Sequence, residues 1–385
     1  MEAIRPFAFR LPREIYFGWG KGAEAGELVK SLGKKAFIVT GRRATKETGI
    51  LGVVTSSLEK AGLEWVVFDQ VEPEPSLETV DAGLRKAYQE NCDLVLSLGG
   101  GSALDCGKAI AGLLGQDESV VPYFNGIKNL EGPGAPWVAL PTTAGTGSEM
   151  TNNAVLTNYR LGIKKSFRSP YLVARMAIID PQFTVFLNAR LTASSGIDAL
   201  VQAIEAFTSP RTNPVSELLA LEAIRLLWQF LPRAVAKGDE RHFREQVAKG
   251  SMISAMAFAN ASSGPAHGLS HIIGPAFGIP HGEACGLLFP VTMRFNREVL
   301  GTKYVAIAKA VGIEGASQEE IIGAFEKAFR GLLEKIGLRT RLRDFGVTKE
   351  ALRKVVKEEL IQRSLRENPR PIDVDEAVEL LCEAW

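Results

Sequence analysis

The pattern of hydrophobic positions divides the chain into two parts near residue 182. Before that point, short apolar runs rich in β-branched residues alternate with amphipathic helical segments. The runs predict strands at residues 36–40, 65–68, 94–98, 137–140 and 177–179. Because alternating strands and helices are typical of βαβ units, we predict an α/β domain with a parallel sheet over residues 1–182.

After Pro181 the hydrophobic pattern takes on a helical period. Apolar residues recur at intervals of three and four in SELLALEAIRLLWQFLPRAV (216–235) and in SQEEIIGAFEKAFRGLLEKIG (317–337). This spacing predicts helices with one apolar face. We therefore expect an all-helical domain over residues 183–385.

Composition and charge narrow the range of functions. Among the 385 residues, 45 Lys and Arg nearly balance 44 Asp and Glu, so no overall basic charge favours nucleic acid or anionic lipid. The first residues, MEAIRPFAFRLPREIYFG, lack the uninterrupted apolar stretch typical of a signal peptide, and no run approaches the roughly 18 apolar residues of a membrane span. We expect a cytoplasmic protein with a small-molecule partner.

The four cysteines, Cys92, Cys106, Cys285 and Cys382, form no CxxC pair. Their scattered positions argue against a zinc ribbon and against a disulfide framework. We expect them to be reduced thiols.

Two glycine-containing loops follow predicted strands. In SLGGGSALDCGKAI (97–110), a strand ends in three glycines and a helix begins at once, which favours a site for a pyrophosphate at the free N–H groups of the helix. PTTAGTGSE (141–149) offers hydroxyl groups suited to phosphate and ribose contacts. Each loop alone is compatible with an ordinary surface turn, but two such loops after parallel strands indicate a nucleotide site.

Three of the four histidines lie in HGLSHIIGPAFGIPH (267–281). His267 and His271 are one helical turn apart, and His281 follows a proline in a glycine-rich turn. A single histidine in an apolar segment is usually a satisfied core residue. Three together, with an apparently unpartnered aspartate elsewhere in the chain, favour a divalent metal site.

A second segment adds oxygen donors to this histidine cluster. In SSGIDALVQAIEAF (194–207), we predict Ser194 or Ser195 as the helix N-cap, with Asp198 and Gln202 on one helical face. An aspartate in such an apolar helix is seldom buried without a partner. The combination predicts a divalent metal held by nitrogen and oxygen ligands.

The segments 97–110, 141–149, 194–207 and 267–281, in their order along the chain and at about these distances, resemble the iron-containing (group III) alcohol dehydrogenase family over nearly the whole chain. The resemblance implies an N-terminal Rossmann-like dinucleotide-binding domain and an all-α C-terminal domain that binds metal, a dehydroquinate synthase-like architecture. It also implies that cofactor and metal meet in the cleft between the domains.

Site residues follow from the resemblance by position. The implied cofactor-binding residues are Gly99, Gly100, Gly101, Ser102, Asp105, Lys108, Thr142, Thr143, Thr146, Asn153 and Lys164. The implied metal ligands are Asp198, His267 and His281, and His271 matches a residue near the nicotinamide.

The chain departs from the family at Gln202, where the family has a fourth histidine ligand. A glutamine carbonyl is neutral and harder than imidazole, and it suits Fe²⁺, Mn²⁺ or Mg²⁺ better than Zn²⁺. We expect Fe²⁺ and include Gln202 in the ligand set. Three alternatives remain: water in the fourth position beside a packed Gln202, weak metal binding, or no metal, as in the related maleylacetate reductases.

The segment VTGRRATKETG (39–49) bears on the choice of cofactor. Gly41 stands where NAD-preferring members of the family often have aspartate, and Arg42 and Arg43 follow it. Arginine at this place suits the 2′-phosphate of NADP, so we expect NADP to be preferred over NAD. The alternative is that both arginines are solvated surface residues.

The predicted activity is that of an NAD(P)H-dependent alcohol dehydrogenase or aldehyde reductase. Hydride would pass between an alcohol or aldehyde and nicotinamide C4, with Asp198, His267 and His281 holding the metal and His271 relaying a proton or orienting the substrate. Alternatives are a metal-independent maleylacetate reductase-like enzyme, a hydroxyacid–oxoacid transhydrogenase, and a nucleotide-binding sensor or structural subunit with a degraded metal site. A homodimer or higher homo-oligomer is expected, without nucleic acid or membrane partners.

Overall fold

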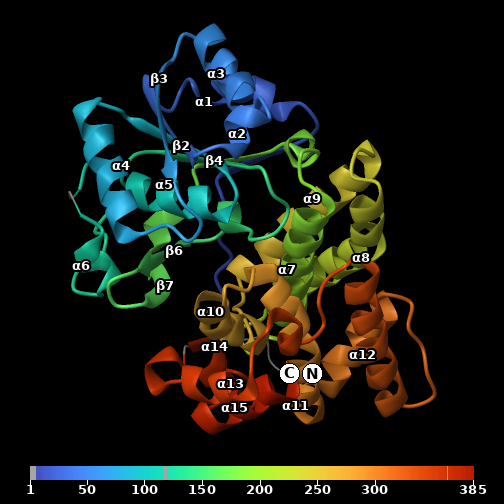
Figure 1. The fold of residues 1–385 in the computed structure, drawn as a ribbon. Coiled ribbons are helices and arrows are strands. Elements are labelled where there is room, and N and C mark those ends of the chain that lie inside the picture. The colour runs from blue at the N-terminus through green and yellow to red at the C-terminus, as the bar shows by residue number, and fades with distance from the viewer. Residues whose placement is uncertain (1–5, 117–118, 362) are drawn as a thin grey trace. The chain divides into compact units, whose positions relative to one another are not determined.

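The computed structural model describes residues 6–116, 119–361 and 363–385, and the chain forms two compact units. The sheet unit comprises Leu11–Phe186, and the helical unit comprises Leu187–Trp385 with the described residues before Leu11 (Figure 1). Among the described residues, no helix combines the length and apolar character needed to cross a bilayer.

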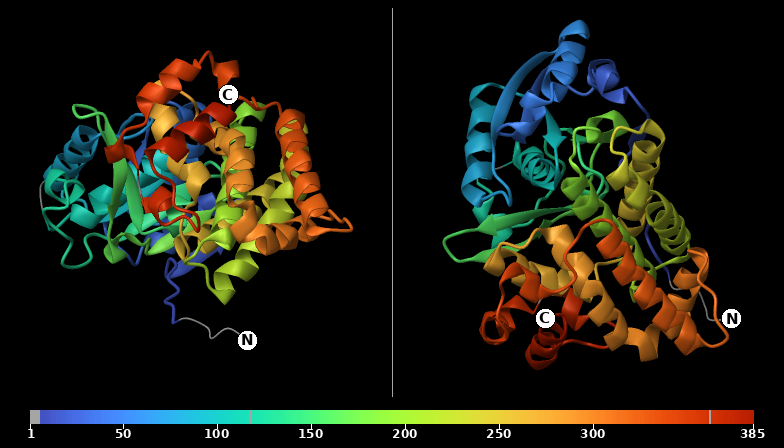
Figure 2. Two further views of the ribbon diagram at one scale, coloured as in Figure 1. Left: turned by 90° about the horizontal axis from the view of Figure 1, so that it is seen from below. Right: turned by 45° about the vertical axis from the view of Figure 1, so that its right-hand side comes forward.

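The sheet unit contains a six-stranded parallel sheet with the order β1-β8-β5-β4-β2-β3. The strands are β1 (Glu14–Phe17), β2 (Lys35–Gly41), β3 (Glu64–Val71), β4 (Leu94–Gly99), β5 (Trp137–Pro141) and β8 (Met176–Ile179). All five predicted strands are confirmed. The sequence pattern missed β1 and an antiparallel hairpin of β6 (Asn153–Asn158) and β7 (Ile163–Arg168). The hairpin, green in Figure 2, is separate from the main sheet and packs through β6 against α5.

Both faces of the sheet are buried, which explains the continuous apolar runs in its strands. Because successive side chains point to opposite faces, Phe37 and Val39 pack with α4 and α5, whereas Ala36 and Ile38 pack with α1 and α3. The helices of this unit are η1 (Lys21–Glu24), α1 (Ala25–Val29), α2 (Ala44–Glu47), α3 (Ile50–Lys60), α4 (Leu77–Gln89), α5 (Gly101–Leu113), α6 (Val121–Phe124), η2 (Ser148–Met150), η3 (Pro170–Leu172) and η4 (Pro181–Thr184).

The other unit contains only helices among its described residues, as the sequence pattern predicts. They are α7 (Ala189–Thr208), α8 (Pro214–Ala236), α9 (Arg241–Ala259), α10 (Pro265–Phe277), α11 (His281–Ala310), α12 (Gln318–Lys335), η5 (Leu342–Phe345), α13 (Lys349–Val355), η6 (Glu358–Leu360), α14 (Arg363–Arg366) and α15 (Val374–Glu383).

The predicted start of α7 was wrong. The helix begins at Ala189, and the side chain of its N-cap residue Asn188 accepts a hydrogen bond from the Leu191 backbone N–H. Ser194 and Ser195 lie inside the helix, and the Ser195 hydroxyl donates to the Leu191 carbonyl at 2.7 Å. A serine hydroxyl can satisfy itself by bonding back to the preceding turn, so serine at this place does not mark a helix start.

Helix α7 is buried on nearly all sides by α8, α9 and α11. Two glycines allow α11 to approach it closely. A Cβ atom on Gly282 would lie 1.9 Å from the Ser194 carbonyl oxygen, and one on Gly286 would lie 3.1 Å from the Ile197 side chain. This contact brings the first turns of α11 next to the middle of α7.

Candidate metal centre and nucleotide loops

The glycine-rich loop after β4 leaves the start of helix α5 open. Gly99 has φ +156°, and a Cβ atom there would lie 2.8 Å from Ala103 Cβ. Gly100 is the N-cap residue and has no side chain with which to bond the first N–H groups of α5. A Cβ atom on Gly101 would lie 2.8 Å from Thr146 Cγ2. The backbone of this loop at Gly101 therefore packs against the side chain of Thr146 in the loop after β5. The arrangement suits an anionic group at the helix N-terminus.

The three loops predicted to bind the cofactor follow strands β2, β4 and β5. These strands are neighbours in the sheet, so the loops begin side by side at its carboxyl edge. Thr40 in β2 pairs with Leu98 in β4, and the Thr142 N–H donates to the Gly99 carbonyl at 2.9 Å. The chain continues from β2 to β3 on one side and from β4 to β5 on the other. Such a reversal of strand order is where nucleotides bind in doubly wound sheets.

The two arginines predicted to contact the 2′-phosphate of NADP lie on the surface of the sheet unit. Arg42 and Arg43 follow Gly41 directly, and both arginines are exposed to solvent. They lie at the end of the strand adjacent to the one that leads to the glycine-rich loop. Their position is therefore compatible with contacts to a 2′-phosphate.

Other predicted cofactor residues have partners within the sheet unit. The Ser102 hydroxyl accepts a hydrogen bond from the Glu74 N–H at 3.2 Å, and Lys164 forms an ion pair with Glu74 at 2.6 Å. The Asn153 side chain donates to the Ser166 hydroxyl at 3.3 Å. Ser102, Asn153 and Lys164 thus lie on α5, β6 and β7, and β6 packs against α5.

Asp105 and Lys108 are buried on α5, and both bond to protein groups. Asp105 accepts hydrogen bonds from the Ser148 hydroxyl at 2.5 Å and the Val155 N–H at 3.0 Å. Lys108 donates to the Thr151 hydroxyl at 3.0 Å and the Asn153 carbonyl at 2.6 Å. Both residues therefore fix the segment 148–155 against α5.

Burial changes the protonation of this polar cluster. Burial raises the pKa of Asp105 and lowers the pKa of Lys108 to about 8. Burial also raises the pKa of Glu149, beside them, to about 7. Glu149 was not among the predicted site residues.

In the helical unit, side chains from three helices meet in one cluster: Asp198 (α7), His267 (α10), and His281 and Cys285 (α11). One ligand atom from each lies within 4.8 Å of the other three. Oδ1 of Asp198 lies 3.2 Å from His267 Nε2 and 3.7 Å from His281 Nε2. The Cys285 Sγ atom lies 3.7 Å from His281 Nε2. Carboxylate, imidazole and thiolate are all ligands of divalent transition metals.

His267 and His281 are each held from behind by another side chain. Nδ1 of His267 lies 2.6 Å from a Glu205 oxygen, which as a carboxylate oxygen accepts the proton. The Ser270 hydroxyl donates to the His267 carbonyl at 2.8 Å, so its oxygen accepts from His281 Nδ1 at 3.2 Å. When each ring is neutral, these bonds place its proton on Nδ1 and leave the Nε2 lone pair pointing into the cluster, an arrangement typical of metal-binding histidines.

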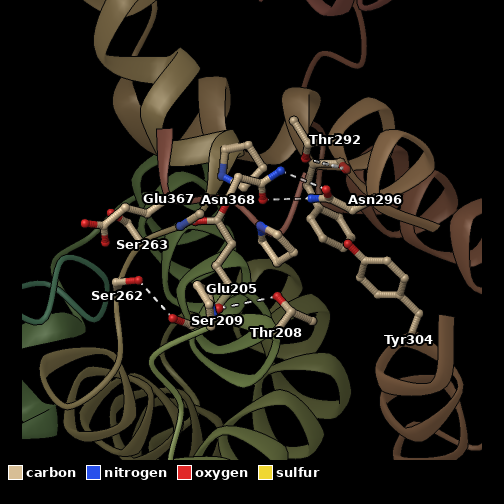
Figure 3. Close-up of a pocket in the computed structure, with 15 residues that line it drawn as sticks. Glu205, Thr208, Ser209, Ser262, Ser263, Thr292, Asn296, Tyr304, Glu367 and Asn368 are labelled. Carbon is tan, nitrogen blue, oxygen red and sulfur yellow. Dashed lines mark hydrogen bonds between the residues drawn. The ribbon is translucent and has the colours of Figure 1, made fainter. Parts of the chain in front are cut away.

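Glu205 is a functional residue that the sequence reasoning missed. It also accepts hydrogen bonds from the Gly264 and Ala266 N–H groups at 2.8 and 2.7 Å, and so it fixes the start of α10. On its other side it lines a small polar pocket in which Asn296 and Asn368 bond to each other (Figure 3). Its spacing, seven residues after Asp198 on the same helical face, was the available signal.

Opposite charges in the cluster stabilise one another. Burial by itself lowers the pKa of His267, but the negative charges of Cys285 and Glu205 raise it well above its ordinary value. Burial by itself raises the pKa values of Asp198 and Cys285, yet the positive charges of the two histidines lower both below their ordinary values. The negative carboxylate and thiolate and the positive imidazoles of the cluster therefore favour one another's charged forms.

His271 and Gln202, the other two predicted residues, lie next to the cluster. His271 is partly exposed and stacks on His281, with ring centroids 5.3 Å apart. Gln202 is buried one helical turn after Asp198. Cys285 was not predicted, although it follows His281 by four residues and so lies on the same face of α11. His281 itself is the first residue of that helix.

Comparisons with known proteins identify the family of the chain. A family model described as iron-containing alcohol dehydrogenase matches residues 12–181, and one described as Fe-containing alcohol dehydrogenase family, C-terminal, matches residues 192–385. The chain is 36% identical to 1,3-propanediol dehydrogenase of Citrobacter freundii over 100% of both chains. It is 32% identical to NADPH-dependent butanol dehydrogenase of Clostridium saccharobutylicum, over 96% of this chain and 95% of the other. A crystal structure of 1,3-propanediol oxidoreductase has a TM-score of 0.94 at 34% identity, covering 99% of this chain and 100% of that one.

Proposed function

Since the chain belongs to the iron-containing alcohol dehydrogenase family, we propose that it interconverts small alcohols and aldehydes with NADP(H) and a divalent metal. An NAD(P)-dependent alcohol dehydrogenase activity follows from the family and the named relatives. The preference for NADP, the metal and the roles of individual residues are the proposal.

The observation that carries the proposal is the cluster of Asp198, His267 and His281, with both Nδ1 atoms bonded from behind. These residues fit a divalent cation because each presents one lone pair toward a common point. A cation held there would supply Lewis-acid polarisation of the substrate oxygen.

The surrounding residues prepare the cluster for this chemistry. Glu205 and Ser270 hold the two imidazoles in the tautomer that leaves Nε2 free of a proton. Asp198 supplies negative charge in a buried place, where charge interactions are strong. Because these groups are fixed before substrate binds, little reorganisation is needed during the reaction.

We assign proton transfer to His271. Its ring stacks on His281 and is partly exposed, so it can exchange protons with water while it remains next to the metal ligands. An imidazole can accept a proton on one nitrogen and release one from the other. This role suits the alcohol proton, which must reach solvent during oxidation and return during reduction.

The open start of α5 and its neighbouring loops are proposed to bind the nucleotide. Gly99, Gly100 and Gly101 leave space and N–H groups for a pyrophosphate. Arg42 and Arg43 offer charge-assisted bonds to a 2′-phosphate. The similarity to an NADPH-dependent butanol dehydrogenase supports this assignment.

The experiment is reduction of a panel of small aldehydes by NADPH, with the enzyme as purified, stripped by chelator, and reloaded with Fe²⁺ or Zn²⁺. We expect turnover by the purified and reloaded forms, and retained NADPH binding without turnover by the stripped form. Full turnover by stripped protein would favour a metal-independent reductase. Nucleotide binding without turnover in every form would favour a sensor or structural subunit.

A homo-oligomer stays a prediction, which light scattering in solution can test.

A further inference from the structure

Cys285 occupies an unusual place for a buried thiol. Its side chain lies in the polar cluster with Asp198, His267 and His281, and its residue is fully buried. The buried Cys92 and Cys106, in contrast, pack into the apolar core of the sheet unit. A thiol that only fills space needs no carboxylate and imidazoles around it.

Three of the six distances among the four ligand atoms are close to the edges of a metal-ligand tetrahedron. With Zn–N and Zn–O bonds of about 2.0 Å and Zn–S of about 2.3 Å, ligand pairs in a tetrahedron are about 3.3 Å apart for N and O and about 3.5 Å apart for N and S. The observed N–O separations are 3.2 and 3.7 Å, and the observed N–S separation is 3.7 Å. These three edges, with all four ligand atoms within 4.8 Å of one another, are compatible with one ion bound by all four side chains.

The backbone supports the thiol in this position. Cys285 follows His281 by one turn of α11, and Gly282 and Gly286 on either side allow α11 to contact α7 closely. A side chain on Gly282 would collide with the Ser194 carbonyl and move the thiol away from Asp198.

We infer that Cys285 is a thiolate ligand of the metal, and that it rather than Gln202 completes an Asp–His–His–Cys centre which selects Zn²⁺ over Fe²⁺, Mn²⁺ and Mg²⁺. The inference rests on the proposed metal site and assigns its fourth protein ligand. On binding, the thiol releases its proton to solvent and the sulfur lone pair bonds to the cation.

Charge and softness both favour this ligand set. Asp198 and Cys285 contribute two negative charges, which neutralise a divalent ion in a buried place. Thiolate is a soft ligand and favours zinc over the hard oxygen-preferring ions, whereas the carbonyl of Gln202 would favour the reverse. The sequence-based expectation of iron is therefore replaced by an expectation of zinc.

The test loads the full-length protein with Co²⁺, a spectroscopic substitute for Zn²⁺, and records near-ultraviolet absorption. The parent is compared with Cys285→Ala, Cys285→Ser, Gln202→Ala and, as a matched control, Cys382→Ser. Cys382 lies on α15 and belongs to no metal-ligand cluster among the described residues. Zn²⁺ affinity is measured for each protein by chelator competition, and folding is monitored by NADPH binding and circular dichroism.

We expect a thiolate-to-cobalt charge-transfer band in the parent, Gln202→Ala and Cys382→Ser proteins, and its loss in both Cys285 variants. Removing a residue that hydrogen-bonds to a metal ligand weakens metal binding about 10–100-fold. Removing a ligand itself should cost at least as much, so Cys285→Ala should weaken Zn²⁺ binding by at least that factor and by more than Gln202→Ala does. If the parent binds Co²⁺ stoichiometrically without the band, Cys285 is not a ligand, although the proposed function stands. If the parent binds neither Co²⁺ nor Zn²⁺, both the inference and the metal-assisted function fail. The parent spectrum gives a result even if the Cys285 variants do not fold.

Discussion

Replacing Glu205 by glutamine should weaken metal binding without touching a metal ligand. Glu205 accepts three buried hydrogen bonds, from the N–H groups of Gly264 and Ala266 and from His267 Nδ1. Glutamine of the same size has only one oxygen, and its NH₂ group must face at least one of these donors. If the NH₂ group faces His267, the imidazole proton moves to Nε2, which can then no longer bind a metal.

The magnitude follows from the lost bonds. A hydrogen bond to a charged group contributes about 1.5–3 kcal/mol, so Glu205→Gln should lower the free energy of unfolding of the helical unit by at least about 2 kcal/mol. Loss of a carboxylate behind a metal-binding histidine costs about 10–100-fold in metal affinity. We therefore expect the Zn²⁺ dissociation constant to rise by that factor.

The assay is chelator competition for Zn²⁺, combined with denaturant unfolding of the same protein. Glu283→Gln is the matched control, because Glu283 is a buried carboxylate of the same unit whose hydrogen bond is to Arg190 at 2.9 Å. It should lose some stability and keep its Zn²⁺ affinity. Equal Zn²⁺ affinity in Glu205→Gln and the parent would refute the argument that Glu205 sets the tautomer of His267.

Two further predictions concern the sheet unit. Replacing Arg42 and Arg43 together by alanine should reduce kcat/KM for NADPH at least tenfold and leave kcat/KM for NADH nearly unchanged. The reason is that one charge-assisted bond to the 2′-phosphate contributes about 1.5–3 kcal/mol. Equal losses with both cofactors would contradict contacts to the 2′-phosphate. Burial raises the pKa of Glu149 from 4.5 to about 7, so the folded state binds this proton more tightly and loses stability as pH rises from 4.5 to 7. Glu149→Gln should therefore be more stable than the parent by up to about 3 kcal/mol at pH 8 and by little at pH 4.5. Denaturant unfolding at both pH values measures this difference, and a difference that does not change with pH would contradict the raised pKa of Glu149.

The fold was largely predictable because its central strands are buried on both faces. Ala36–Val39 read as an uninterrupted apolar run, and such runs between helical segments leave few alternatives to a parallel sheet. Strand β1 is short and lies at the sheet edge with only half-buried side chains, so it gave a weak signal. Strand β7, IKKSFR, has mostly polar side chains because it lies outside the main sheet.

The candidate site was predictable where residue type and spacing together indicated chemistry. Asp198, His267 and His281 are rare residue types in apolar segments, and the structure brings all three together. Cys285 and Glu205 escaped prediction because their roles depend on helix packing. The sequence does not show that α11 contacts α7 through glycines, or that Glu205 reaches the start of α10.

The most direct test of the metal-assisted mechanism is Asp198→Ala, with metal content, NADPH affinity and aldehyde turnover measured on one preparation. Asp198 lies in the proposed metal cluster of the helical unit, whereas the proposed nucleotide loops belong to the sheet unit. The variant should bind NADPH as the parent does, lose its metal, and show kcat lowered at least about 100-fold, because Lewis-acid assistance contributes several kcal/mol. A variant that retained most of the parental kcat with unaltered metal content would contradict the assignment of this cluster as the catalytic metal centre.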